Sequence, residues 1–373
     1  MKHISAQNTV NELLQMAGIT INGKEPYDIQ VNNNKLYSLV LREGEMGLGN
    51  SYVEGWWDCA HLDEFFCRVM SARLHEKITS DKKLLLKMLL GKLINFQSKK
   101  RAWIVGEKHY DLGDTLYSLM LESNMVYTCA YWKNASNLEE AQQAKLDLIC
   151  KKLQLKPGMR LLDIGCGWGS LAKYAAENYG VSVVGATISR KQYEHAKQNY
   201  KGLPIDIRLQ DYRDLEGQFD RVSAIGLMEH VGHSNYRTLM QVVNRCLTDD
   251  GIFVLHTIGN GGVAVPPDPW MSKYIFPNFM LPSIPLIGKA AEGLFIMEDW
   301  HNFGADYDKT LVAWQRNFEK HWPTLKSHYD EHFFRRWNYY LLSCAGSFRA
   351  RYIQLWQVVF SKKGIKGGYQ APR

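Results

Sequence analysis

The sequence predicts an α/β fold in which helices cover a parallel sheet. The first observation is that residues 161–172, LLDIGCGWGSLA, have the pattern of a buried strand, a glycine-rich turn and the start of a helix. The second is that apolar, β-branched runs typical of buried parallel strands recur at 181–189, 205–211, 219–232 and 251–259. Helical stretches separate these runs, and this alternation predicts a doubly wound sheet.

The glycine-rich turn predicts a ligand site. Asp163, Gly165, Gly167 and Gly169 follow the spacing D-x-G-x-G-x-G. Glycine lacks a Cβ, so the backbone can turn sharply there and a ligand can lie against it. The spacing differs from the dinucleotide pattern G-x-G-x-x-G, which places helix amides over a pyrophosphate. The turn therefore favours a smaller ligand without phosphate, although this motif alone leaves a purely structural turn open.

Polar residues fall where the predicted strands end, and ligands of doubly wound sheets bind outside those carboxyl ends. These residues are Asp163, Thr187, Asp211, Glu229 and His256. No acidic residue ends the second strand, where many nucleotide-binding folds place a partner for the ribose. Thr187 and Gln192 are therefore the candidates for that role.

The composition is that of a globular protein with a sizeable core. The chain has 373 residues, of which 46% are hydrophobic and 11 are tryptophan, enough for one large domain or two ordinary ones. We find no apolar stretch of about 18 residues, so no membrane span is predicted. The first residues lack the apolar core of a signal peptide. The seven cysteines form no C-x-x-C pair, and we expect reduced, cytosolic thiols.

The basic residues are concentrated in one segment. The net charge of +7 favours an anionic partner without choosing between nucleic acid and an acidic lipid surface. Residues 81–101 hold seven Lys or Arg and a single Asp, with aliphatic residues between them. Such a segment can lie at a membrane interface. A core helix with outward lysines explains it equally well, and the sequence leaves both alternatives open.

The chain divides into regions of different character. Residues 1–100 are expected to be mostly helical, and the segment from about 102 to 150 approaches the sheet with a helix capped by Asn137. A Pro-rich insertion at 260–285 is expected to be irregular and to line a binding site. The part from about 293 onward is expected to end in a strand pair at the sheet edge, which includes IQLWQVVF.

Taken together, segments from the whole chain resemble bacterial cyclopropane-fatty-acyl-phospholipid synthases, the group that includes the mycolic acid cyclopropane synthases. The segments are QSKKRAWIVGEKHYDLGD, YTCAYW, LLDIGCGWG, GATIS, LQDYRDL, MEHVG, LHTIG, KYIFPN, MEDWHNFGADYD and FRARYIQLWQVVF. The resemblance implies a class I S-adenosylmethionine-dependent methyltransferase fold, which is Rossmann-like, with a smaller helical domain at the N-terminus. We expect residues 1–100 to form that helical domain and to contact lipid, and residues 101–373 to form the catalytic domain.

The resemblance also implies a reaction. Such enzymes add a methylene from S-adenosylmethionine across a cis double bond of a phospholipid acyl chain, with bound bicarbonate as the general base. An alkene is a weak nucleophile, so the methyl group must be held close to it. The resulting cation must lose a proton to a base in a dry pocket. By resemblance, the bicarbonate pocket consists of Cys129, Glu229, His256, Tyr307 and the amide of Ile258.

For the cofactor, the resemblance adds residues around the glycine turn and the strand ends. They are Tyr127, Thr128, Asp163, Gly165, Gly167, Thr187, Ile188, Gln192, Asp211 and Tyr212. Backbone at the glycines would face the methionine part, polar side chains the ribose, and Asp211 with Tyr212 the adenine. At position 128 serine is expected in relatives, and threonine keeps the hydroxyl.

Each of the pocket residues also has an ordinary structural explanation. Alone, Cys129 would be a buried thiol, His256 a core histidine and Tyr307 a loop residue. Glu229, His230 and His233 match no standard zinc spacing, so no metal is predicted. The match of all these residues to family positions is what carries the assignment.

The resemblance implies partners as well. Unsaturated phospholipids would be met at the bilayer surface, so peripheral association with the inner face of the cytoplasmic membrane is expected, and relatives suggest a homodimer. No pocket motif for a flipped base is recognised, so nucleic acid is not expected. The alternatives are a methyltransferase that acts on another lipid or gives a methyl-branched product, and a lipid-binding module without activity.

Overall fold

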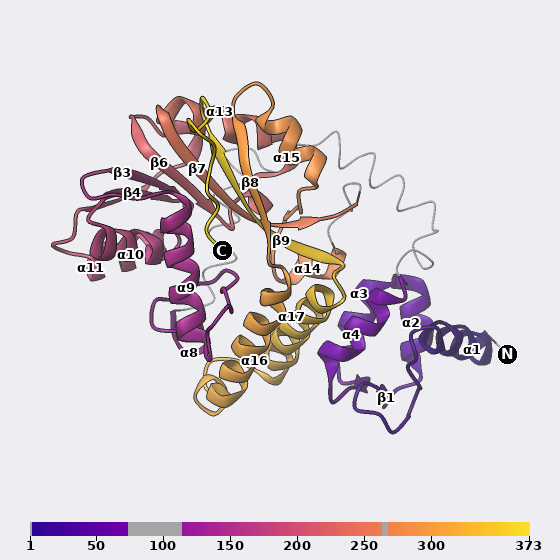
Figure 1. Ribbon diagram of the computed structural model, residues 1–373. Coiled ribbons are helices and arrows are strands. Elements are labelled where there is room, and N and C mark those ends of the chain that lie inside the picture. The colour runs from indigo at the N-terminus through magenta and orange to yellow at the C-terminus, as the bar shows by residue number, and fades with distance from the viewer. Residues whose placement is uncertain (1, 74–113, 263–267) are drawn as a thin grey trace. The chain divides into compact units, whose positions relative to one another are not determined.

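The computed structural model describes residues 2–73, 114–262 and 268–373 (Figure 1). The basic segment 81–101 lies outside these residues. The chain forms two compact units. Unit one comprises Met1–Ile94, Pro266–Pro277 and Tyr307–Ile353, and unit two comprises Asn95–Val265, Asn278–Asp306 and Gln354–Arg373. The expected division into 1–100 and 101–373 therefore differs from the compact units, because two later segments of the chain pack with the N-terminal helices.

Unit two is built on a seven-stranded sheet of order β5-β4-β3-β6-β7-β9-β8 (Figure 1). Its strands are β3 (Arg160–Ile164), β4 (Ser182–Thr187), β5 (Ile205–Leu209), β6 (Phe219–Ile225), β7 (Leu247–Asn260), β8 (Ile296–Asn302) and β9 (Ile353–Ser361). The first five pair in parallel, and β8 pairs antiparallel with β9. The doubly wound sheet and the strand pair at its edge are both confirmed.

Alternation along the strands separates the core of unit two into two layers. Leu161 and Val183 pack on one face with Leu146 of α9 (Leu138–Lys152) and with α10 (Ser170–Tyr179). Their neighbours Leu162 and Val184 pack on the other face, against α13 (Tyr236–Cys246) and α15 (Ile284–Ala291). Successive side chains of a strand point to opposite faces, which explains why strands buried on both faces are continuously apolar.

Two local predictions have opposite outcomes. Asn137 caps α9 as expected, and its side chain accepts a hydrogen bond of 2.9 Å from the amide of Glu140. The expectation that residues 260–285 are irregular is wrong where α14 (Pro269–Tyr274) and the start of α15 form. In both helices a proline occupies the first turn, where its missing N–H costs no hydrogen bond.

Unit one is helical, as the sequence predicts for the N-terminal region. Its helices are α1 (Lys2–Gln15), α2 (Lys35–Glu43), α3 (Glu45–Val53), α4 (Leu62–Ser71), α14, the part of α16 (Ala305–Leu325) from Tyr307 onward, and α17 (Glu331–Arg349). It also contains two short paired strands, β1 (Gln30–Val31) and β2 (Trp57–Asp58). Gly346 allows α17 to approach α4 closely, since a Cβ there would meet the backbone of Asp63 and Cys67. Among the described helices, none combines the length and hydrophobicity that a membrane span needs.

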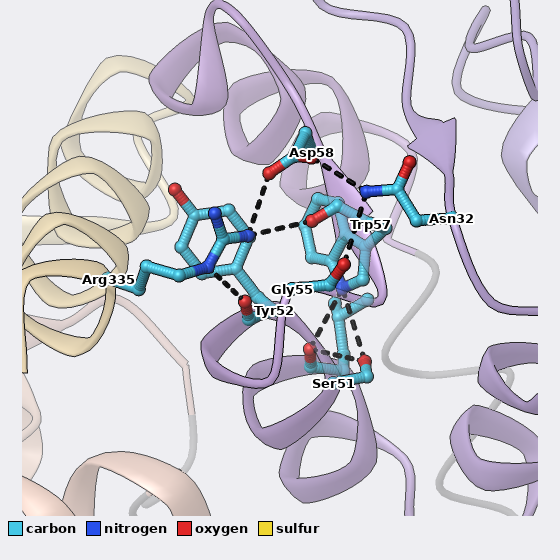
Figure 2. Close-up of polar contacts among 8 residues, drawn as sticks. Asn32, Ser51, Tyr52, Gly55, Trp57, Asp58 and Arg335 are labelled. Atoms are coloured by element: carbon cyan, nitrogen blue, oxygen red, sulfur yellow. Dashed lines mark hydrogen bonds and ion pairs between the residues drawn. The ribbon is translucent and has the colours of Figure 1, made fainter. Parts of the chain in front are cut away.

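Arginines of α17 join it to the N-terminal helices. Figure 2 shows Arg335 donating to the carbonyls of Tyr52 and Trp57, at 2.6 and 2.9 Å, and to the carboxylate of Asp58 at 2.8 Å. Its guanidinium carbon also lies 4.2 Å from the centroid of the Tyr52 ring. A planar group with five donors suits such a site, because it satisfies several acceptors at once. These contacts explain why chain segments nearly three hundred residues apart form one unit.

Candidate active site

The glycine turn between β3 and α10 has the conformation that the sequence predicts. Gly165, Gly167 and Gly169 have φ of 77°, 56° and 86°, where residues with a Cβ are strained. At Gly169 the space is also closed, since a Cβ would lie 2.6 Å from Tyr200. At Gly167 a Cβ would meet nothing within 4 Å, so only the backbone conformation requires glycine there. The open space beside Gly167 leaves its backbone accessible to a ligand.

Asp163 lies at the end of β3 and is buried rather than exposed at the edge. Its carboxylate accepts a hydrogen bond of 2.7 Å from the hydroxyl of Ser223 on β6. Burial raises the pKa of Asp163 to about 6, against the opposing effects of Ser223 and Lys145. The side chain therefore joins two neighbouring strands directly beneath the glycine turn.

The two candidates for a ribose contact are hydrogen-bonded to each other. The Thr187 hydroxyl donates to Gln192 Oε1 at 2.8 Å and accepts from the Ser189 amide at 3.1 Å. Ser189 also caps α11 (Arg190–Asn199). The half-buried Ile188 lies in the turn that brings them together. Their grouping at the end of β4 agrees with the prediction, and contact with a ligand stays a prediction.

Asp211 and Tyr212 follow β5, and the structure adds a residue that the sequence analysis missed. Arg213 binds Asp211 through two parallel bonds, Nε to Oδ1 at 2.8 Å and Nη2 to Oδ2 at 2.6 Å. The only local signal for it was a basic residue two positions after the acid. The Tyr212 hydroxyl is buried without a hydrogen-bond partner among the described residues, and burial raises the pKa of Tyr212 to about 12. A ligand group bound by Asp211 must share that carboxylate with Arg213.

Glu229 lies in the one-turn helix α12 (Met228–Val231) directly after β6, and 6% of the residue is exposed. Its Oε1 accepts a hydrogen bond of 2.7 Å from the amide of Ile258, while Oε2 has no partner among the described residues. Burial raises the pKa of Glu229 to about 7, although the Ile258 amide acts in the opposite direction. The carbonyl of Glu229 also accepts from the amide of Met280 at 2.8 Å. The second half of the Pro-rich insertion is thus fixed directly to this acid.

His256 lies on β7, two residues before Ile258, and is 1% exposed. The amide nitrogen of Gln357 on β9 lies 3.1 Å from Nδ1. With that amide nitrogen directed at the ring, Nδ1 is the acceptor and the ring proton lies on Nε2. Nε2 has no partner among the described residues. Burial holds the pKa of His256 well below its usual value, and the charges of Lys145 and Lys152 act in the same direction. The imidazole is therefore neutral at physiological pH.

The remaining predicted pocket residues differ in where they lie. Cys129 is fully buried in unit two, and its thiol donates to the carbonyl of Ala130 at 3.2 Å. Tyr307 belongs to unit one, where its ring packs against Phe348 at a centroid distance of 4.5 Å. Glu229, His256, Ile258 and Cys129 thus share one unit. The membership of Tyr307 in their pocket stays a prediction.

Two buried polar residues of α9 were also missed. The ammonium of Lys145 donates to the Thr128 hydroxyl at 2.9 Å, and the amide of Gln142 donates to the Thr128 carbonyl at 2.8 Å. In sequence they resemble ordinary solvent-facing residues of a polar helix. A signal was present, because Lys145 lies seven residues after the buried Leu138 and four after the buried Ala141, on the same face.

Comparison with known proteins identifies relatives over most of the chain. The family model described as mycolic acid cyclopropane synthetase matches residues 97–358. The cyclopropane-fatty-acyl-phospholipid synthase of Escherichia coli (strain K12) is 56% identical over 363 residues, which cover 97% of this chain and 95% of that protein.

Solved structures give the same result. The cyclopropane synthase MmaA2 from Mycobacterium tuberculosis matches with a TM-score of 0.66 and 30% identity, over 70% of this chain and 98% of that one. The mycolic acid cyclopropane synthase CmaA1, complexed with SAH and CTAB, matches with a TM-score of 0.65 and 33% identity over 70% and 98%. The expected Rossmann-like class I methyltransferase fold is confirmed. The chain is therefore an enzyme that belongs to the mycolic acid cyclopropane synthetase family.

Proposed function

We propose that the protein transfers a methylene from S-adenosylmethionine to the cis double bond of an unsaturated phospholipid acyl chain, giving a cyclopropane ring and S-adenosylhomocysteine. The observation that carries the proposal is a pair of buried atoms, Glu229 Oε2 and His256 Nε2, that have no partner in the described part of the chain. They lie toward the same edge of the sheet as the glycine turn. The identity of 56% to a cyclopropane-fatty-acyl-phospholipid synthase supports the same reaction.

The cofactor would be held by the residues gathered at the carboxyl edge of the sheet. The backbone at Gly165 and Gly167 would face the amino-acid part, with Tyr127 and Thr128 on the neighbouring segment, and the open space beside Gly167 suits such a contact. Thr187, Ile188 and Gln192 would meet the ribose. Asp163 would support the turn, and Asp211 with Tyr212 would flank the adenine. The bound sulfonium supplies the methyl group, and its orientation against the double bond is what these residues provide.

Bicarbonate is the base that we propose, and the polar atoms present suit it. A bicarbonate ion has acceptor oxygens for the Nε2–H of His256 and a hydroxyl that can donate to Glu229 Oε2. The amide of Ile258, now bound to Glu229, would be shared with the ion. Cys129 and Tyr307 complete the proposed set. Because Glu229 and His256 are almost fully buried, they can hold the base away from bulk water.

The substrate requires contact with a bilayer. The proposal therefore includes peripheral association with the inner face of the cytoplasmic membrane, and a homodimer as in relatives. Residues 1–100, with the basic segment 81–101, remain the proposed region of lipid contact. Aliphatic residues between lysines would support binding to an anionic surface.

The test is a product analysis. The purified protein is incubated with S-adenosylmethionine, bicarbonate and vesicles of dioleoyl phospholipid, and the acyl chains are examined by mass spectrometry before and after hydrogenation. We expect a gain of one CH₂ that resists hydrogenation. A gain that leaves a reducible double bond would instead indicate a methyl-branched product. No gain, with S-adenosylhomocysteine still bound by the protein, would contradict the proposal.

Two controls sharpen the result. Vesicles of a saturated phospholipid offer no double bond and should give no product. Removal of carbon dioxide from the buffer should lower the rate, and added bicarbonate should restore it. A rate that is independent of bicarbonate would contradict the proposed base while leaving the methylene transfer in place.

A further inference from the structure

Helix α9 carries two almost fully buried lysines two turns apart. Lys145 is 1% exposed and Lys152 is 0% exposed. Lys152 donates to His301 Nδ1 at 3.0 Å and lies 3.8 Å from the carboxylate of Asp299. Lys145 donates to the neutral hydroxyl of Thr128 and forms no ion pair within 4.0 Å among the described residues. Burial of a charged group costs free energy, so an ammonium directed at a neutral hydroxyl calls for an explanation.

The contact with Lys145 determines how the Thr128 hydroxyl can be used. An ammonium group only donates, so Thr128 Oγ1 is the acceptor and its own proton must point elsewhere. The described residues offer that proton no acceptor at hydrogen-bond distance. Thr128 is half-buried and belongs to the segment that leads into Cys129. Toward the described residues its proton is therefore unused, and the contact from Lys145 leaves the hydroxyl to act as a donor on its other side.

The neighbouring contacts hold Thr128 in this orientation. Gln142, one turn before Lys145 on α9, donates to the carbonyls of Thr128 and Val126 at 2.8 and 3.2 Å. The methyl group of Thr128 lies against Gly226, where a Cβ would come within 2.9 Å of Thr128 Cγ2. With the methyl against Gly226 and the hydroxyl bound to Lys145, both contacts favour this rotamer of the side chain. The amide of Gly226 in turn donates to the carbonyl of His256 at 2.8 Å.

The charge of Lys145 favours an anionic acceptor for the Thr128 proton. Burial lowers the pKa of Lys145 to about 8, and the charges of Glu122, Cys129 and Asp163 act in the opposite direction, so the group is protonated at neutral pH. A cation behind a hydroxyl polarises its O–H bond and strengthens its donation, above all to a carboxylate.

We infer that Lys145 is a positioning residue which, through Thr128, directs a hydrogen bond to the carboxylate of the cofactor's amino-acid part. The inference rests on the proposed function, since it takes Thr128 and the glycine turn to be cofactor contacts. Lys145 itself touches no ligand. It orients and polarises the hydroxyl that does.

The test compares two ligands that differ only in the amino-acid part. S-adenosylhomocysteine carries the carboxylate, and 5′-methylthioadenosine lacks it. We expect Lys145→Met to weaken the binding of S-adenosylhomocysteine about tenfold or more, as for loss of a hydrogen bond to a charged group, measured by calorimetry. Binding of 5′-methylthioadenosine should change less than about twofold. Lys152→Met is the matched control on the same helix and should leave the ratio of the two affinities unchanged.

A double-mutant cycle tests whether Lys145 acts through Thr128. Thr128→Val keeps the shape and removes the hydroxyl, so Lys145→Met in that background should weaken the binding of S-adenosylhomocysteine no further. Additive losses would contradict the inference, as would equal weakening of both ligands or no change. If Lys145→Met does not fold, Lys145→Gln retains a donor without charge and should lose part of the same ligand preference. A wild-type protein that binds neither ligand would instead contradict the proposed function.

Discussion

A charged network in unit one and a pair of buried polar side chains in unit two differ in whether their partners satisfy them. In unit one, Arg349 of α17 pairs with Asp63 and Glu64 of α4 and with Asp308 of α16, at 2.6 to 3.3 Å. In unit two, Glu229 and His256 each keep a buried polar atom without a partner among the described residues. Paired charges hold elements together, whereas an unpaired buried atom destabilises the fold unless a ligand completes it. The difference separates a structural network from a candidate site.

The same contrast recurs within helix α9. Lys152 lies beside His301 and the carboxylate of Asp299, and the backbone carbonyl of Lys152 also accepts from the hydroxyl of Tyr369. The ammonium of Lys145, two turns earlier, donates to a hydroxyl whose proton has no acceptor among the described residues. Burial alone therefore does not indicate function. The feature that indicates a functional site is a buried polar group whose hydrogen-bonding capacity is not satisfied by its partners.

The largest effect is expected at the incomplete site. Glu229→Gln should lower kcat at least about 100-fold, because glutamine has a single acceptor oxygen and no charge, so it cannot accept from both the Ile258 amide and the hydroxyl of a bound bicarbonate. Affinity for S-adenosylhomocysteine, measured by calorimetry, should stay within about twofold. The matched control is Glu216→Gln, which changes an exposed acid of the same unit. Wild-type turnover in Glu229→Gln would remove the distinction between the two regions.

The difference in stability between the wild type and the same variant should depend on pH. Burial raises the pKa of Glu229 from 4.5 to about 7, so the folded state binds more protons in that interval than the unfolded state. The contribution of Glu229 to the stability of the wild type therefore falls as pH rises from 4.5 to about 7, whereas glutamine does not titrate. Relative to the wild type, Glu229→Gln should gain up to about 3 kcal/mol between pH 5 and pH 8. Denaturant unfolding at both pH values measures this, and a constant difference would argue that Glu229 is paired like the charges of unit one.

A smaller effect is expected in the paired network. Arg349→Met should destabilise the protein by about 2 kcal/mol, because three half-buried carboxylates lose their common cation. Arg316→Met is the control, since Arg316 is exposed on α16 and forms no ion pair among the described residues. It should change stability by less than about 0.5 kcal/mol. Thermal unfolding measures both, and the affinity of Arg349→Met for S-adenosylhomocysteine should be unchanged. A selective loss of that affinity would show that the network serves the site.

Much of unit two could be predicted because its signals are local. Continuous apolar runs identified β3 to β7, and the spacing D-x-G-x-G-x-G identified a turn whose glycines all have positive φ. The helix N-cap at Asn137 could likewise be predicted from the neighbouring residues. The prediction of an irregular insertion at 260–285 is wrong in part, because proline in the first turn of a helix is compatible with the helix and α14 and α15 both begin this way.

The composition of unit one could not be predicted in the same way. The helical character of its N-terminal part follows from local pattern, but nothing local in α17 indicates that it packs on α4 rather than on the sheet. That choice depends on Gly346, which permits close approach, and on Arg335 and Arg349, whose partners lie nearly three hundred residues away. Hydrophobic periodicity reports which face of a helix is buried, not which element covers it.

By itself, the sequence determined the sheet, the glycine turn and the family, because strand patterns, turn chemistry and motif spacing are properties of short segments. Only the tertiary structure decided which polar atoms meet. Gln357 reaches His256 across 101 residues of chain, and Ile258 occupies one oxygen of Glu229 while the other stays free. Lys145 lies behind Thr128 for the same reason. Hydrogen bonds act over about 3 Å, so they depend on the packing of distant segments, which local residue patterns do not specify.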